Sequence, residues 1–231
     1  MAQTQVELLE IAARTLEPLL PEIVFVGGCA TALFVTDPSA ARARVTYDVD
    51  VIAEIVSYVE YVAFSERLRA LGLEEDTREG APVCRWRHGE LTLDVMPLDA
   101  TILGFSNRWY PDALREAETI ALPSGRLLRV IAAPLFLATK IEAFKSRGNE
   151  DYFAIRDLED VVTIIDGRAS LAGEVRGSSG DVRTYLAQAI NKLLSEPRFL
   201  DALPGYLLPD PANQARFYQL IATLKELATL G

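Results

Sequence analysis

The spacing of apolar residues predicts that strands and helices alternate in the front half of the chain. Apolar positions recur at helical spacing over residues 6–20, which predicts an amphipathic helix. Residues 23–26 form a short apolar run typical of a strand, and residues 30–35 have the composition of a short helix. The pair Gly27-Gly28 lies between these two runs. We therefore expect a strand, a glycine turn and a helix in that order.

Further apolar runs predict more strands in the front half. Two pairs of runs flank short polar segments that contain glycine, which is the pattern of β-hairpins. One of these segments, Arg87-His88-Gly89-Glu90, holds the only histidine of the chain, and we expect it to be a surface turn. The predicted strands lie at 49–53, 83–86, 91–95, 120–122 and 127–131, and one helix is expected at 57–71.

After Pro134 the pattern changes to helical spacing alone. Helices are expected at 135–146, 151–165, 182–195 and 212–230. No repeat, low-complexity tract or long polar linker marks an independent domain boundary. We therefore expect an α/β (α+β) fold with a core at 1–133. The helical region at 134–231 is expected to pack on that core and to complete its site.

Composition and charge restrict the functional classes. A net charge of -10 argues against non-specific binding to nucleic acid or to acidic membranes, because both need a surplus of Lys and Arg. A single histidine excludes Ser-His-Asp, Cys-His and multi-histidine metal centres unless that one imidazole is well placed. The two cysteines lack metal-site spacing, and no signal-like or membrane-spanning apolar run occurs. We expect an unprocessed cytoplasmic protein with no membrane partner.

Two aspartates in one strand are the first candidates for chemistry. Asp48 and Asp50 are separated by one residue, so they project from the same face, roughly 6.6 Å apart at about 3.3 Å per residue. At an effective dielectric near 20, two such charges repel by about 4 kcal/mol. The pair is stable when it binds a cation or when one member is protonated. Magnesium (or manganese) suits such an oxygen site.

A third acid lies in a neighbouring predicted strand. Asp94 alternates with Leu93 and Val95 and therefore faces away from them. Aspartate is disfavoured in strands, and three acids on two apolar strands can coordinate two divalent ions roughly 3.5 to 4 Å apart. Exposure on an open face of the sheet is the alternative reading of these acids.

Glycine and lysine residues extend the candidate site. Gly27 and Gly28 allow the backbone to approach a phosphate closely at a helix start, although a turn required only for packing has the same sequence. Lys140 lies within an apolar helical stripe and so needs a buried anion. Arg147 follows seven residues later, and both cations are expected to reach one triphosphate.

The next predicted helix carries two more acids. Asp157 lies at the edge of its apolar stripe and is the better candidate for a pocket. Asp160 is expected near the opposite side of the helix. A solvated helix face, or contacts with Arg147 and Arg156, is the alternative for both acids.

These residues resemble a known family when they are taken in order. The chain carries Gly27-Gly28-x-Ala30, then Arg44-x-Thr46-x-Asp48-x-Asp50, Asp94, Lys140-x-x-Ala143-x-x-x-Arg147 and Asp157-Leu158-x-Asp160. This series resembles the minimal nucleotidyltransferases of the AbiEii/AbiGii toxin group, within the DNA polymerase β superfamily. The resemblance covers about residues 20 to 165. One departure is Phe34, at a place where these toxins often carry histidine.

The resemblance implies a mixed sheet flanked by helices and a specific division of roles. Asp48 and Asp50 would bind magnesium, with Asp94 as a third metal ligand and catalytic carboxylate. The triphosphate would be held by Gly27, Gly28, Thr46, Lys140 and Arg147, and Asp157 would complete the catalytic set.

The expected function is a magnesium-dependent transfer of a nucleoside monophosphate from a nucleoside triphosphate to an acceptor hydroxyl, by a toxin of a toxin–antitoxin system. The acceptor stays open among a tRNA end, a protein and a small molecule, and a small antitoxin-like protein is a candidate partner. A catalytically inactive protein of the same fold, acting through protein partners, is the alternative. A metal-dependent nuclease is a third reading. A candidate basic rim for the acceptor comprises Arg42, Arg44, Arg67, Arg69, Arg85 and Arg87.

Overall fold

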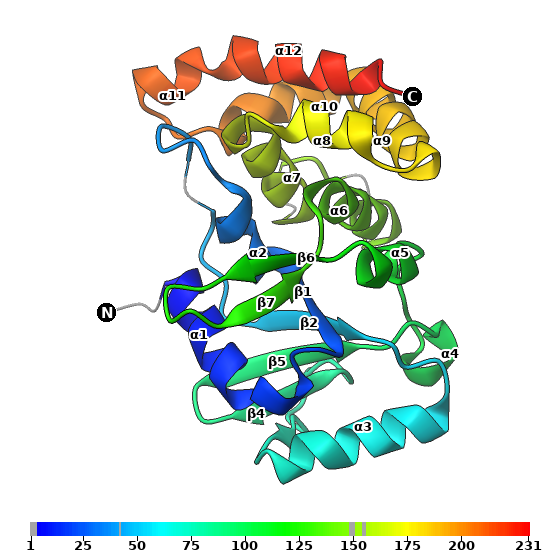
Figure 1. The fold of residues 1–231 in the computed structure, drawn as a ribbon. Helices are drawn as coiled ribbons and strands as arrows, with labels where there is room; N and C mark the ends of the chain where they lie inside the picture. Colours follow the sequence, from blue (N-terminus) through cyan, green and yellow to red (C-terminus); the bar gives the residue numbers. More distant parts are fainter. Residues whose placement is uncertain (1–3, 42, 148–150, 154–155) are drawn as a thin grey trace. The chain divides into compact units, whose positions relative to one another are not determined.

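The computed structural model describes residues 4–41, 43–147, 151–153 and 156–231. The chain divides into two compact units (Figure 1). Unit 1 comprises Met1–Ala30 and Val45–Ala132, and unit 2 comprises Thr31–Arg44 and Ala133–Gly231. Helix α2 (Gly27–Phe34) begins in unit 1 and ends in unit 2. The sequence placed a boundary after residue 133, and the segment 31–44 is the part of unit 2 that lies before that boundary.

Unit 1 is built on a seven-stranded mixed sheet with the strand order β3-β4-β5-β2-β1-β7-β6. Strand β1 pairs antiparallel with β2 and parallel with β7, and β2 pairs parallel with β5. The strands are β1 (Ile23–Val26), β2 (Val49–Ala53), β3 (Glu74–Glu75), β4 (Arg85–His88), β5 (Leu91–Met96), β6 (Glu118–Ala121) and β7 (Leu127–Val130). The expected α/β fold, with a mixed sheet and a helical C-terminal half, is confirmed.

The centre of the sheet is the core of unit 1. All four residues of β1 are buried, which agrees with an apolar strand covered on both faces.

Helix α1 contacts β5 and β2, and Thr4 and Glu7 form a capping box at its start. The predicted helix over 6–20 ends early, because a short 3-10 turn that contains Pro18 follows it. The helices of this unit are α1 (Gln5–Thr15), α3 (Tyr58–Ala70), α4 (Ala100–Leu103) and α5 (Tyr110–Arg115), with the 3-10 turn at Glu17–Leu19.

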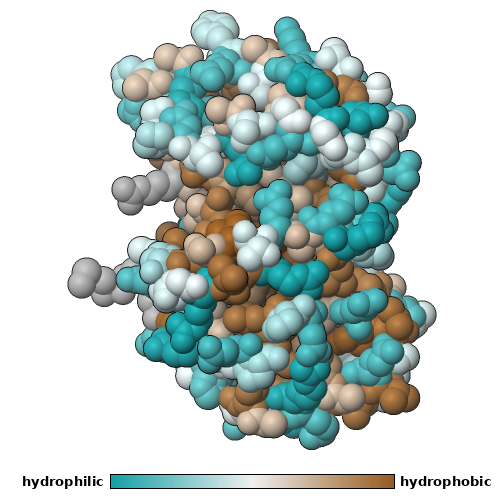
Figure 2. Space-filling view, in the orientation of Figure 1, coloured by the Kyte–Doolittle hydropathy of each residue, from teal (hydrophilic) through white to brown (hydrophobic). Residues whose placement is uncertain are grey.

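Helix α3 carries apolar side chains on its exposed side. Tyr58, Val59 and Val62 are 68%, 78% and 42% exposed. Figure 2 shows apolar surface in the region of this helix.

Within the part of the chain that the structure describes, no helix combines the length and the apolar character required to cross a membrane.

Unit 2 consists of packed helices together with the segment 31–44. Helix α6 contacts α7, α8 and α9, and α12 contacts α7, α8 and α9. The predicted helix over 212–230 is broken at Arg216, where α11 ends and α12 begins. The helices are α6 (Ala133–Arg147), α7 (Arg156–Gly167), α8 (Leu171–Gly177), α9 (Gly180–Leu194), α10 (Pro197–Ala202), α11 (Pro211–Ala215) and α12 (Phe217–Ala228), with a 3-10 turn at Leu203–Tyr206.

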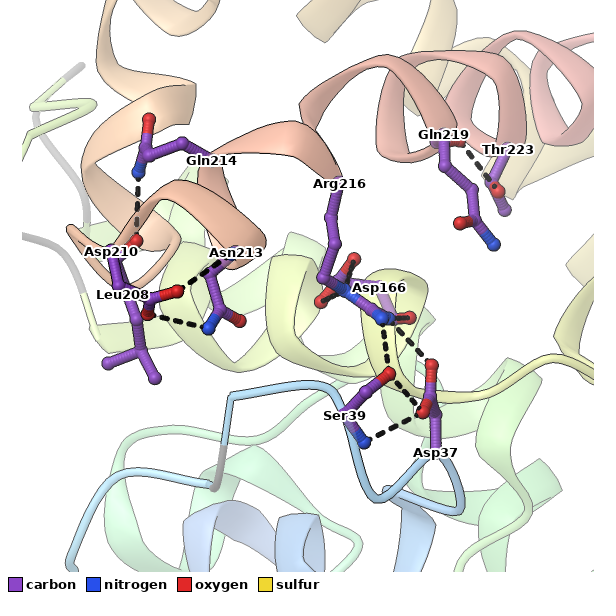
Figure 3. Close-up of polar contacts among 10 residues, drawn as sticks. All are labelled: Asp37, Ser39, Asp166, Leu208, Asp210, Asn213, Gln214, Arg216, Gln219 and Thr223. Carbon is purple, nitrogen blue, oxygen red and sulfur yellow. Dashed lines mark hydrogen bonds and ion pairs between the residues drawn. The ribbon is translucent and has the colours of Figure 1, made fainter.

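Arg216 joins the segment 31–44 to the helices of unit 2 (Figure 3). Its Nε lies 3.0 Å from both carboxylate oxygens of Asp166, and its other nitrogens donate to Asp37 at 2.8 Å and to Ser39 at 2.7 Å. Hydrogen bonds from Ser39, and then the contact with Arg216, lower the pKa of Asp37 to about 2. The backbone N–H of Asp37 donates to the carbonyl of Gly167 at 3.0 Å. These contacts explain why this segment belongs to unit 2.

Candidate functional site

Two of the three acids predicted from the sequence lie in neighbouring strands of unit 1, and the third lies just ahead of one of these strands. Asp50 of β2 and Asp94 of β5 are register partners in a parallel pair, so their side chains point to the same face of the sheet. Asp48 lies two residues before Asp50, immediately ahead of β2.

The charges of these acids contribute to raised pKa values at two buried cysteines. Burial, followed by the charges of Asp50 and Asp48, raises the pKa of Cys29. Burial, followed by the charges of Asp94 and Asp50, raises the pKa of Cys84 to about 12. The strand register thus places the carboxylates of Asp50 and Asp94 side by side near the start of β2.

A guanidinium group neutralises part of this charge. Arg85 of β4 faces Asp94 across an antiparallel strand pair. Its Nε and one terminal nitrogen donate to the two oxygens of Asp94 at 2.8 and 2.7 Å, and the same terminal nitrogen donates to Asp48 at 2.9 Å. The hydrogen bond with Asp94 raises the pKa of Arg85, so the guanidinium stays charged. This arrangement makes the burial of Asp94, which is 6% exposed, compatible with its charge.

Thr46 fixes the orientation of Asp48. Its hydroxyl donates to Asp48 Oδ1 at 2.6 Å, and Thr46 is itself buried. Both oxygens of Asp48 therefore accept a hydrogen bond, one from Thr46 and one from Arg85. The predicted residue Thr46 thus contacts a predicted carboxylate, although its contact with a nucleotide stays a prediction.

The glycine turn lies directly against Asp50. Gly27 begins helix α2 with a φ of +70°, a conformation that favours glycine. A Cβ atom at Gly27 would lie 1.8 Å from Asp50 Oδ2. The carboxylate of Asp50 therefore occupies the space that any larger residue would fill, and it lies beside the first residue of the helix.

Replacing Gly27 with alanine is expected to destabilise the fold and displace Asp50. The positive φ costs about 1–2 kcal/mol for a residue with a Cβ, and the clash adds roughly 1–3 kcal/mol. Gly125→Ala is a matched control, because Gly125 has a φ of +85° and a Cβ there would meet nothing within 4 Å. Urea unfolding of both variants measures the difference. Equal losses of stability would contradict close packing of Gly27 against Asp50.

The oxygen donors of this group in unit 1 are the carboxylates of Asp48, Asp50 and Asp94. Across the described residues, no group of three or more His, Cys, Asp or Glu side chains is arranged to hold a metal ion. Magnesium is commonly bound through one or two carboxylates together with substrate phosphates. Asp50 is the predicted carboxylate that lies beside the start of α2. Metal binding by Asp48, Asp50 and Asp94 stays a prediction.

Unit 2 contains the second group of predicted residues. Lys140 of α6 is 9% exposed, so the predicted burial of this lysine is confirmed. Its Nζ lies 2.7 Å from Asp160 and 3.3 Å from Asp157, both on α7. Arg44 also donates to both oxygens of Asp160, at 3.0 and 3.2 Å. The chain itself therefore provides anions for Lys140.

The expected position of Asp160 is wrong. The sequence placed it near the solvated side of the helix, but its side chain is only 1% exposed. Helix α7 is buried around most of its circumference from Asp160 onward, so the stripe that contains Leu158 and Val161 does not mark the whole buried surface. Asp157, by comparison, is partly exposed and contacts Lys140, as expected of a residue at the edge of the stripe.

Three further residues singled out from the sequence are Arg147, Arg42 and His88. Arg147 ends helix α6, and its side chain lies outside the described residues, as does Arg42. His88 is exposed beside the turn of the β4–β5 hairpin, and its Nδ1 lies 2.8 Å from the carbonyl oxygen of Gly72. The expectation of a surface turn is confirmed. That Lys140 and the strand acids bind one triphosphate stays a prediction.

The pairing of Arg85 was missed by the sequence analysis, which placed this residue only on a basic rim. A signal for it exists, because a two-residue turn at Gly89-Glu90 puts Arg85 opposite Asp94 in the hairpin. Three other arginines of the proposed rim also pair with acids: Arg44 with Asp160, Arg67 with Glu22, and Arg69 with Glu66 and Glu75.

The chain has low sequence identity to solved structures that cover its full length. No protein-family model matches the chain, and no curated protein matches it significantly. Among solved structures, JHP933 from Helicobacter pylori is 13% identical, with 100% of this chain and 91% of that chain covered and a TM-score of 0.48. A protein from H. pylori described as a candidate nucleotidyltransferase is 12% identical, with 100% and 94% covered and a TM-score of 0.45. At this level of similarity, function has to be argued from the chain's own residues.

Proposed function

We propose that this protein is a nucleotidyltransferase that moves a nucleoside monophosphate from a nucleoside triphosphate to an acceptor hydroxyl with the help of magnesium. One observation carries the proposal. Asp50 lies in register with Asp94 on a parallel strand pair, and its carboxylate fills the space beside Gly27 at the start of α2. Carboxylates can bind the metal ion of a metal–triphosphate complex, and the N–H groups at a helix start can bind its phosphate oxygens.

The proposed reaction gives separate roles to the two acids at β2, to the glycine turn and to Thr46. Asp48 and Asp50 would hold the metal ion, which supplies positive charge to the phosphates. The N–H groups at Gly27 and Gly28 would bind phosphate oxygens. The acceptor hydroxyl would attack the α-phosphorus, so that a new P–O bond forms, the bond to pyrophosphate breaks, and the hydroxyl proton passes to a water molecule. Thr46 keeps Asp48 oriented for this step, because it donates to Oδ1.

The roles of Lys140, Arg147 and Asp157 rest on the family resemblance and stay predictions. The pairing of Lys140 with Asp157 and Asp160 gives the lysine a structural role that needs no nucleotide. Lys140→Met should weaken triphosphate binding if the resemblance carries over. It should lower stability in either case, so the two effects have to be measured separately.

A binding protein without activity is the second candidate, and a specific observation favours it. Arg85 already pairs with Asp94 and Asp48, and Lys140 pairs with Asp157 and Asp160, so each of these four acids has a cationic partner within the chain. In such a protein the acids would serve stability and the surface would bind a protein partner.

Thermal unfolding with magnesium and each of the four nucleoside triphosphates separates the two candidates. A ligand at 100 times its dissociation constant raises the free energy of unfolding by about 2.7 kcal/mol. We expect this stabilisation with at least one triphosphate and none with magnesium-free nucleotide. If no triphosphate stabilises the protein, the binding protein is favoured.

Transfer of label from α-³²P-triphosphates to RNA, protein or metabolite fractions identifies the acceptor. Release of unlabelled pyrophosphate, together with transfer of the α-label to an acceptor, would exclude a nuclease. A toxin role predicts that induced expression arrests bacterial growth and that Asp50→Asn relieves the arrest. Co-purification of a small protein that restores growth would identify an antitoxin-like partner.

A further inference from the structure

We propose that Arg85 is a built-in counter-ion that competes with the divalent cation for Asp48 while it holds Asp94 in place. In this view Arg85 sets the affinity of the site for metal, and Asp94 anchors Arg85 rather than binding the metal directly. The inference rests on the proposed function and deepens it, because it concerns the regulation of the same site.

The geometry separates the two contacts of Arg85. Asp94 receives a fork of two hydrogen bonds at 2.8 and 2.7 Å, whereas Asp48 receives one at 2.9 Å. Forked pairs between arginine and a carboxylate are both stronger and more directional than single contacts. The contact with Asp94 is therefore the more persistent of the two.

The two carboxylates that Arg85 contacts also differ in how deeply they are buried. The side chain of Asp94 is 9% exposed, and that of Asp48 is 36% exposed. A buried carboxylate that loses its partner is left with an uncompensated charge, whereas an exposed one can be solvated. Asp94 therefore depends on Arg85, and Asp48 is free to exchange Arg85 for another cation.

A cation that enters at Asp48 and Asp50 replaces the single Arg85–Asp48 hydrogen bond. The guanidinium remains on Asp94, where it repels the incoming charge. Asp48 keeps its orientation during this exchange because Thr46 holds its other oxygen. Metal affinity in the absence of nucleotide is therefore lower than two carboxylates alone would give, and triphosphate oxygens are needed to complete binding.

Manganese binding tests the role of Arg85. Free Mn²⁺ is followed by electron paramagnetic resonance, with and without a non-hydrolysable triphosphate analogue. Arg85→Gln removes the charge and should tighten Mn²⁺ binding without nucleotide by about tenfold, the effect of losing one nearby like charge. Arg87→Gln is the matched control, because Arg87 lies two residues along the same strand and is exposed. It should leave the affinity within about twofold of the wild-type value.

Arg85→Lys keeps the proposal testable if the glutamine variant does not fold. Lysine retains a charge but has no fork to bridge Asp94 and Asp48. It should bind Mn²⁺ more tightly than wild type and less tightly than Arg85→Gln. Unchanged Mn²⁺ affinity in a folded Arg85 variant would overturn the inference. If wild type binds no Mn²⁺ even with the analogue, the proposed function fails instead.

Discussion

Asp50→Asn should lower the rate of nucleotidyl transfer at least about a hundredfold, as loss of a charge-stabilising group commonly does. Asparagine keeps the shape of the side chain but removes a negative charge from the proposed metal pair. Asp50 of β2 lies in register with Asp94 of β5 and directly beside the Gly27 turn. Single-turnover transfer from a labelled triphosphate measures the effect.

The fold should survive this change, because asparagine fits the space beside Gly27. Circular dichroism and urea unfolding check this point. Asp112→Asn is the control in unit 1, since it removes the same charge from α5, where Asp112 pairs with Arg115. It should transfer at the wild-type rate. Normal turnover in a folded Asp50→Asn protein would refute the assignment of Asp50.

Asp160→Ala should lower the free energy of unfolding by about 3–5 kcal/mol, the usual result of removing one partner from a buried ion pair. Asp160 is 1% exposed and is the shared carboxylate of Lys140 and Arg44. Its loss leaves two cations, both largely buried, without that carboxylate. Urea unfolding followed by circular dichroism gives the free energy of unfolding.

Asp181→Ala provides the comparison within unit 2. Asp181 is exposed in the first turn of α9, so its replacement should cost less than about 1 kcal/mol. If Asp160→Ala costs no more than this control, the buried network does not stabilise the unit. A double-mutant cycle of Lys140→Met and Asp160→Ala should reveal coupling between the two residues, because they are in direct contact.

Local patterns in the sequence predicted the parts of the candidate site that depend on neighbouring residues. The apolar run at 23–26, the glycine pair after it and Asp50 of β2 all lie where their patterns placed them. The hairpin of β4 and β5 was also predicted, because its turn residues are local. Boundaries were less accurate, as shown by α2, which begins at Gly27 rather than at residue 30.

The sequence by itself determined which residues are unusual: acids in apolar strands, glycines at a helix start and a lysine in an apolar stripe. Only the tertiary structure decided what each charge contacts. Arg44 and Asp160 are 116 residues apart in the chain, and Arg85 and Asp48 are 37 apart, so no local periodicity connects them. A buried charge is stable only beside an opposite charge or a polar partner. The packing of strands and helices decides which partner that is.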